Sequence, residues 1–168
     1  MNRGILRILD ILIIIALIIL LYIVIEPQYR LARINENRIK LRSNMFTVKA
    51  GVERYISFHE GHYPYNMQLI YDNIKEIELP ENPYTGKVMS FSDLIQFKYD
   101  IPGEVEDDAV DGVNGIQRGE PGQIGVGFFI PMGKDSIPTK IGIIGFDETG
   151  KPFILEEGKK KRVVLLIS

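Results

Sequence analysis

The sequence predicts an α+β protein in which a long, kinked N-terminal helix, half of it membrane-spanning and half of it packed, lies against a C-terminal antiparallel sheet of about four strands. Three patterns predict this fold. Residues 11–25 are all apolar or aromatic. Apolar residues recur at helical spacing between Leu41 and Tyr55, and strand-like runs separated by turns fill residues 124–168. A chain of 168 residues has room for one membrane segment and one such domain.

The composition argues against several kinds of partner and chemistry. Twenty Lys and Arg residues against 22 Asp and Glu residues give a net charge of −2, so nothing predicts nucleic acid as a partner. The sequence contains no cysteine, which excludes disulfides, thiol nucleophiles and thiolate metal ligands. Its serines lie outside any nucleophile-elbow sequence. We therefore expect a protein that is not an enzyme, and we predict no catalytic residue.

The N-terminal apolar run is long enough to cross a membrane. Residues 8–25 form a stretch of eighteen with a single charge, Asp10, and about 20 such residues span a hydrocarbon core as a helix. Arg3 and Arg7 precede the run, which by the positive-inside rule keeps the N-terminus cytoplasmic. No small-residue cleavage site follows the run, so the sequence predicts a retained anchor.

These features predict a single-pass protein of the cytoplasmic (inner) membrane. Residues 1–27 would be the leader and transmembrane helix, and residues 28–168 an extracytoplasmic domain. A basic cluster follows the span on the far side, against the simplest form of the charge rule. Its members are Arg30, Arg33, Arg38, Lys40 and Arg42.

Asp10 is an acid within an apolar run, and an ionised carboxylate in a membrane is costly without a partner. Two interpretations stay open. Near the helix end, its side chain can reach the headgroups and complement the positive end of the helix dipole. Alternatively, Asp10 pairs with a cation on another subunit during assembly.

The second half of the long helix is predicted over residues 28–60. Pro27 lacks an N–H group, and we expect it to kink the helix without ending it. An apolar stripe that requires a covering sheet follows at steps of three and four: Leu41, Met45, Val48, Val52 and Tyr55. Gly61 suits the left-handed position after a helix, and Pro64 follows it shortly.

Residues 61–123 are predicted as a loop region, with a short helix or loop over 66–79 and a short strand or helical turn over 88–99. Sequential hairpins then predict an antiparallel meander of four strands. The strand candidates are 125–130, 140–146, 152–156 and 162–167. Gly142 and Gly145 within the second candidate indicate a close approach to the helix, or a bulge.

Asp10, near the start of the apolar run, is followed seventeen residues later by Pro27. This arrangement resembles the N-terminus of type IV pilins and type II secretion pseudopilins, in which an acid stands at the fifth mature position and a proline seventeen residues later. The resemblance implies a mature chain that begins at Leu6, with Leu6, Asp10 and Pro27 as assembly residues. The prepilin peptidase of that family cuts after Gly, whereas here Ile5 precedes Leu6 and Gly4 lies one position earlier.

Two later segments resemble pseudopilins as well. The aromatic-rich stretch 55–64 ends in Gly-His-Tyr-Pro and resembles the terminus of their long helix. The turn-rich segment 79–86, which contains Asn82-Pro83-Tyr84, resembles part of the αβ loop in their major type. The resemblance therefore implies a pilin-like fold for the whole domain.

The function that the resemblance implies is structural. The chain would be a subunit of a pilus or pseudopilus-like filament, for example in type II secretion, with itself and other pilin-like subunits as partners. The resemblance does not distinguish secretion, pilus and DNA-uptake roles. The alternative is a non-polymerising, single-pass membrane-anchored extracytoplasmic binding module, which Ile5 and the charged Arg7 favour.

The acidic loop 104–115 is the candidate metal site. Asp107, Asp108, Asp111 and Asn114 offer oxygen ligands, and calcium takes six to eight of these. The spacing is not that of an EF-hand, but major pseudopilins hold calcium in a loop near the sheet. The resemblance thus implies calcium as a candidate cofactor, and the alternative is a solvated surface loop.

His59 and His62 lie three residues apart at the predicted helix end. Two histidines could hold a transition metal only with further ligands. We interpret them instead as residues that interact with the last carbonyl groups and the dipole of the helix.

Overall fold

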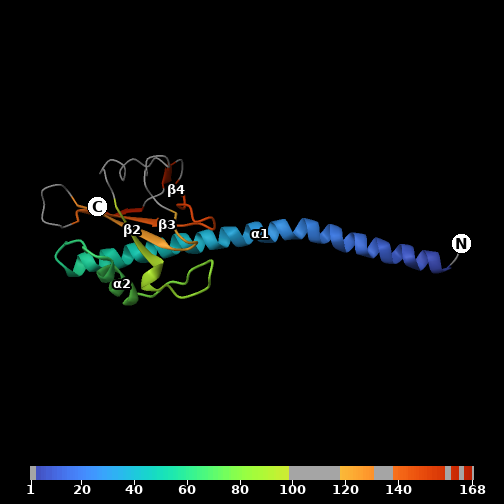
Figure 1. Ribbon diagram of the computed structural model, residues 1–168, viewed down its shortest axis with the longest axis horizontal. Coiled ribbons are helices and arrows are strands. Elements are labelled where there is room, and N and C mark those ends of the chain that lie inside the picture. The colour runs from blue at the N-terminus through green and yellow to red at the C-terminus, as the bar shows by residue number, and fades with distance from the viewer. Residues whose placement is uncertain (1–2, 99–117, 131–137, 158–159, 163–164, 168) are drawn as a thin grey trace. The chain divides into compact units, whose positions relative to one another are not determined.

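The computed structural model of the chain describes residues 3–98, 118–130, 138–157, 160–162 and 165–167. The chain divides into two compact units, Met1–Glu36 and Asn37–Ser168, and each is described by itself. Figure 1 shows the order of the elements along the chain.

The first element is helix α1, Arg3–Phe58. It is the only described element of the first unit, and it supplies residues 37–58 to the second. Pro27 lies inside the helix and does not end it, as the sequence predicts. Gly61 has a φ of 85°, and its N–H donates to the Ile56 carbonyl at 3.0 Å. The prediction of a left-handed glycine at this helix end is confirmed.

The segment 66–79, for which the sequence predicts either a short helix or a loop, contains helix α2, Met67–Lys75. Its N-terminus is capped by Asn66, whose side-chain oxygen accepts the Leu69 N–H at 3.0 Å. The apolar face of α2 is buried through Met67, Ile70 and Ile74. A Cβ atom on Gly51 of α1 would lie only 2.7 Å from Ile74 Cγ1. Gly51 therefore allows the two helices to pack closely.

The main sheet has four strands in the order β1-β2-β3-β6. Strand β1, Leu94–Lys98, follows a short 3₁₀ turn, Phe91–Asp93. The next two strands are β2, Ile124–Phe129, and β3, Lys140–Gly145. Strand β6, Leu165–Ile167, pairs with β3 at the sheet edge.

The expected all-antiparallel arrangement is wrong for this sheet, which is mixed. Strand β1 pairs with β2 in parallel, while the β2–β3 and β3–β6 pairs are antiparallel. Parallel neighbours require a connection of about a dozen residues or more, and 99–123 is long enough. The predicted sheet lacks this pairing because it includes only the strand candidates that follow residues 99–123.

The expected strand 152–156 does not join the main sheet beside β3. A separate hairpin forms instead from β4, Leu155–Glu157, and β5, Lys160–Arg162. Its register sets Glu156 opposite Lys161 and Glu157 opposite Lys160. The expected strand 162–167 is therefore divided, and only its last residues pair with β3.

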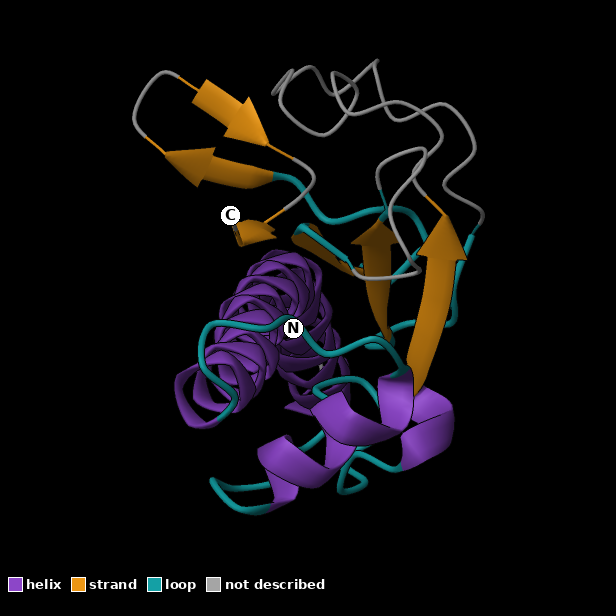
Figure 2. Ribbon diagram, turned by 90° about the vertical axis from the view of Figure 1, so that its left-hand side faces the viewer, coloured by secondary structure: helices purple, strands orange, loops and turns teal. Residues whose placement is uncertain are grey.

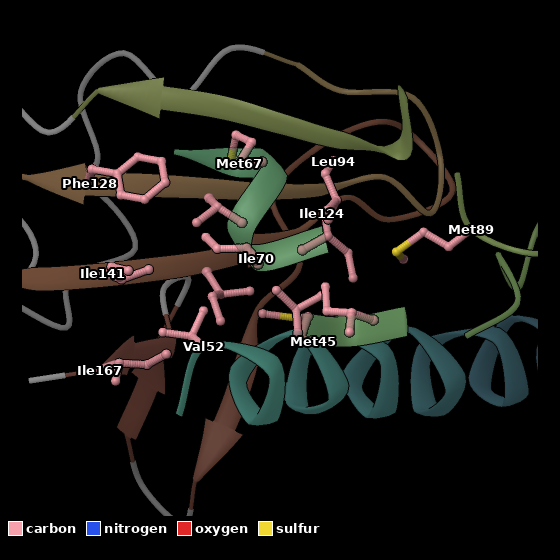
Figure 3. Close-up of a cluster of buried hydrophobic side chains, with 14 of the residues drawn as sticks. Met45, Val52, Met67, Ile70, Met89, Leu94, Ile124, Phe128, Ile141 and Ile167 are labelled. Carbon is pink, nitrogen blue, oxygen red and sulfur yellow. The ribbon is translucent and has the colours of Figure 1, made fainter. Parts of the chain in front are cut away.

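The core of the second unit forms where α1 packs on one face of the sheet. The stripe residues Leu41, Met45, Val48 and Val52 are fully buried, and Tyr55 is 6% exposed. Val126 lies opposite Ile143 and Phe128 opposite Ile141. Figure 2 shows the strands and α2 arranged beside α1, and Figure 3 shows the apolar side chains from all these elements meeting in one cluster. The predicted burial of the stripe against a sheet is confirmed.

Gly145 allows α1 to approach the sheet closely. A Cβ atom there would lie 2.9 Å from Met45 Sδ and 3.0 Å from Leu41 Cγ. Of the two interpretations offered for this glycine, the structure supports close approach to the helix. Gly142 lies opposite Gly127 in the β2–β3 register.

Candidate functional site

Among the described residues, the longest run of exposed apolar side chains belongs to α1 in the first unit. Every large apolar side chain from Ile11 to Ile25 is between 47% and 70% exposed. The exposure continues around the whole helix, because no residue of this stretch is buried. Among the described residues, α1 is the one helix long and apolar enough to cross a membrane. The chain is thus consistent with a single-pass membrane protein.

The predicted assembly residues all lie in this helix. Leu6 and Asp10 belong to its first turns, and Pro27 lies just after the exposed apolar stretch. The pairing of Asp10 with another subunit stays a prediction, since a single chain cannot contain it.

The predicted calcium ligands lie outside the described residues: Asp107, Asp108, Asp111 and Asn114. Within the part of the chain that the structure describes, no three His, Asp or Glu side chains come together as a metal site would require. Calcium stays a prediction for the acidic loop.

His59 is held at the end of α1 by its neighbours. Its Nδ1–H donates to the Tyr55 carbonyl at 2.8 Å, and its ring stacks on that of Tyr55 with centroids 3.8 Å apart. The His62 N–H donates to the His59 carbonyl at 2.9 Å. The ring contacts of His59 agree with its interpretation as a residue that binds the last carbonyl groups of the helix, whereas the contact of His62 is made by its backbone alone.

A polar cluster that the sequence did not predict joins three distant segments of the second unit. We call it the Arg38 cluster, and it consists of Arg38, Tyr84 and Glu148. Arg38 donates from Nη2 to Glu148 Oε1 at 2.7 Å and from Nε to Oε2 at 3.4 Å. The Tyr84 hydroxyl donates to Glu148 Oε2 at 3.3 Å. Glu148 thus connects α1 with the segment that contains Tyr84.

Glu148 contributes to a raised pKa in both of its titratable partners. The hydrogen bond that Arg38 donates to Glu148 raises the pKa of Arg38 above its usual value, although partial burial acts the other way. Burial, followed by the negative charge of Glu148, raises the pKa of the Tyr84 hydroxyl. Arg38 therefore stays charged and Tyr84 stays neutral around pH 7, the states in which both can donate to the carboxylate.

The turn after β3 positions Glu148. Asp147 Oδ1 accepts the Thr149 N–H at 2.8 Å, the Thr149 hydroxyl at 2.7 Å and the Lys151 N–H at 3.1 Å. Gly150 closes the turn with a φ of 72°. Local turn residues are visible in sequence, but a partner 110 residues away is not. The sequence therefore predicts the turn after β3 but not the ion pair between Glu148 and Arg38.

The segment 79–86 is held by a buried asparagine. Asn82 is 4% exposed, and its amide donates to the Pro121 carbonyl at 3.1 Å. Its side-chain oxygen accepts the N–H groups of Tyr84 and Thr85 at 2.9 and 3.2 Å. A Cβ atom on Gly122 would collide with this side chain, so the glycine leaves room for the asparagine.

Asn44 adds the link to α1. It is 6% exposed, and its amide donates to the Glu81 carbonyl at 2.7 Å. The described polar groups thus hold the segment 79–86 on α1 and on the 119–123 turn. Their arrangement fixes segments in place, a structural role that fits the prediction of no catalytic residue without testing it.

Comparisons with known proteins add no relative. No protein-family model matches the chain, and neither the curated proteins nor the solved structures include a significant match.

Proposed function

We propose that the chain is the structural subunit of a pilus or pseudopilus-like filament, anchored by its N-terminal helix before assembly. One observation carries the proposal: a single helix, α1, contains both an apolar stretch that is exposed throughout, 11–25, and a stripe buried in a folded domain. In such a subunit, neighbouring subunits can replace the lipid around the exposed stretch while the domain that contains the buried stripe stays folded.

The chemistry of the exposed stretch supports this exchange. Lipid is as apolar as the side chains themselves, so helices in a membrane associate through packing and polar contacts, not through the hydrophobic effect. Neighbouring copies of α1 can therefore replace lipid around residues 11–25 at little cost. In a filament these helices would form the shared core.

Asp10 supplies the polar contact in this proposal. After cleavage before Leu6, the carboxylate pairs with the new amine of a neighbouring subunit. A buried ion pair adds specificity more than net stability, because desolvation offsets most of the Coulomb attraction. The pair would therefore set the axial register of adjacent subunits. Pro27 would shape the helix after the membrane.

The proposed location follows from the charges at the N-terminus. Arg3 and Arg7 hold the N-terminus in the cytoplasm, and the pilin-like domain lies outside the cytoplasmic membrane. Type II secretion is one setting for such a filament, with other pilin-like subunits as partners.

The test combines the N-terminus of the protein with one substitution. Mass spectrometry of protein from its native membrane is expected to find a chain that begins at Leu6 with a methylated amine. Asp10→Ala is expected to insert into the membrane as the wild type does and to be lost from sheared filaments, since the pairing carboxylate is gone. Asp10→Glu, which keeps the charge, is the matched control and is expected to assemble.

The alternative, a non-polymerising anchored binding module, has a specific observation in its favour. Ile5 stands where the family has Gly, and Arg7 adds a charge near the cleavage position. Intact Met1 in the mature protein, together with normal behaviour of Asp10→Ala, would contradict the filament and support the module.

A further inference from the structure

Two arginines in the two turns of α1 that follow the exposed apolar stretch have no acidic partner among the described residues. Arg30 and Arg33 lie in α1 and are exposed. Among the described residues, no carboxylate lies within ion-pair distance of either guanidinium, although Glu26 precedes Arg30 by one helical turn. Both cations are therefore exposed, and within the described part of the chain nothing neutralises their charge.

Arginines further along α1 are different, because the second unit provides their partners. Arg38 lies 2.7 Å from Glu148, and Arg54 lies 3.9 Å from Glu76. Arg42 lies over the Phe46 ring, with 5.8 Å to its centroid. The contrast separates the basic cluster into members with partners in the second unit and two members, Arg30 and Arg33, that no described carboxylate pairs with.

The positions of Arg30 and Arg33 along α1 match the headgroup layer of a bilayer. At about 1.5 Å per residue, Arg30 and Arg33 lie roughly 8 and 12 Å beyond Ile25 along the helix. The headgroup region adds about 5 to 8 Å on each side of the hydrocarbon core, and arginine side chains can reach back towards it. Tyr22 and Tyr29, 70% and 71% exposed, flank this boundary as interfacial aromatic residues do.

We propose that Arg30 and Arg33 bind the phosphate groups of anionic phospholipids in the leaflet from which α1 emerges. A guanidinium donates two parallel hydrogen bonds to a phosphate, and it binds more strongly when the lipid carries a net negative charge. The apolar stretch that precedes them holds the arginines at the right depth. This inference concerns the anchored subunit and does not depend on filament assembly.

The second possible partner is a carboxylate of another copy, for which Glu26 is available. The lipid is favoured because both arginines follow the apolar stretch directly, where headgroups surround the helix on all sides. A single Glu26 from a neighbouring copy could neutralise only one of the two cations. The experiment below separates the two partners.

The experiment uses the full chain in nanodiscs of phosphatidylcholine that contain a small fraction of spin-labelled lipid. Electron spin resonance measures the protein-restricted fraction of labelled phosphatidylglycerol relative to labelled phosphatidylcholine. We expect the wild type to prefer phosphatidylglycerol and R30Q/R33Q to lose about half of that preference. Each arginine near the membrane surface contributes about a fivefold preference for anionic lipid. The measured preference is smaller, because it is an average that includes lipids in contact with neither arginine.

Three controls make the result specific. R30K/R33K keeps the charge and is expected to retain most of the preference, and Arg54→Gln, which removes a charge paired within the fold, is expected to retain all of it. Any contribution of Arg3 and Arg7 at the other end of the span is the same in every variant. Equal circular dichroism spectra establish that the variants are folded.

Two outcomes would overturn the proposal. The first is a wild type without preference, or R30Q/R33Q with the full preference. The second is that R30Q/R33Q changes the energy transfer between differently labelled copies in larger vesicles, while its lipid preference equals that of the wild type. That result would assign Arg30 and Arg33 to a second copy of the chain.

Discussion

Helix α1 contains two apolar stretches, of which one is exposed and the other is buried. Residues 11–25 in the first unit are exposed throughout, whereas the stripe from Leu41 to Tyr55 in the second unit is buried throughout. Both stretches are α-helical. The difference lies in what covers them: the sheet of the second unit covers the stripe, whereas no described residue covers the first stretch.

The sequence explains this difference through the width of the apolar surface. In the second unit, charged residues such as Arg42 and Glu53 limit the apolar surface to one face, which a sheet can cover. In the first unit the apolar surface goes around the helix, so a single sheet could cover only part of it. A helix that is apolar all round suits a membrane or a bundle of other helices.

The largest expected effect comes from a charge in the buried stripe. Val48 is fully buried, so Val48→Asp places an unpaired carboxylate in the core and is expected to lower the free energy of unfolding by about 4 kcal/mol. Ile39→Asp, at a position 70% exposed on the same helix, is the matched control and is expected to change it by less than about 0.5 kcal/mol. Urea unfolding of the full chain in detergent, followed by near-ultraviolet circular dichroism, measures both.

A charge in the exposed stretch is expected to act on the membrane step alone. Ile18 is 61% exposed, so Ile18→Asp leaves the folded domain unchanged and costs about 3 kcal/mol in membrane insertion. The fraction of carbonate-resistant protein in membranes is expected to fall, while unfolding in detergent matches the wild type. Ile18→Leu controls for the substitution itself. A large loss of domain stability in Ile18→Asp would break the comparison between the two stretches.

A smaller effect is expected at Gly145, where α1 approaches the sheet closely. In Gly145→Ala the added Cβ crowds Met45 and Leu41, and overpacking of this kind costs about 1 to 3 kcal/mol. Met45→Ala in the same chain removes the crowded sulfur. The double variant is therefore expected to be more stable than the sum of the two single effects predicts. Additive effects in urea unfolding would show that the close contact is not the source of the cost.

How much of this could be predicted from sequence depends on the distance over which each contact acts. The helix, its buried stripe and the glycine that ends it follow from patterns within a few residues, and all of these predictions are confirmed. The parallel pairing of β1 with β2 depends on where a long connection returns the chain. No local pattern encodes that return, so the sheet was wrongly expected to be entirely antiparallel.

The polar contacts show the same limit. Asp147 and Gly150 form a recognisable turn, but nothing near Glu148 in sequence indicates Arg38 or Tyr84 as its partners. The same holds for Asn82, which was noted only as part of a turn-rich segment and proves to be a buried hydrogen-bonding centre. Burial of a polar side chain is a property of the assembled fold, so sequence alone could not assign it.

The smallest expected effect tests the Arg38 cluster through pH. Burial and the charge of Glu148 raise the pKa of Tyr84 above its ordinary value of about 10. The folded state thus keeps the proton when the unfolded state has lost it. The stabilisation from Tyr84 is complete below about pH 10 and is lost as pH rises further. Wild-type stability is therefore expected to fall more steeply between about pH 9.5 and 11 than that of Tyr84→Phe.

Because Tyr84 is only half-buried, solvent screening limits this difference to less than about 1 kcal/mol. Tyr65→Phe, at a position 65% exposed, is the matched control and is expected to follow the wild type over the same range. Urea midpoints of the three proteins, measured at several alkaline pH values, give the slopes directly. Parallel slopes for the wild type and Tyr84→Phe would mean that the hydroxyl ionises equally easily in the folded and unfolded chains. Glu148 would then hold Arg38 alone, and Tyr84 would contribute to the second unit only through the packing of its ring.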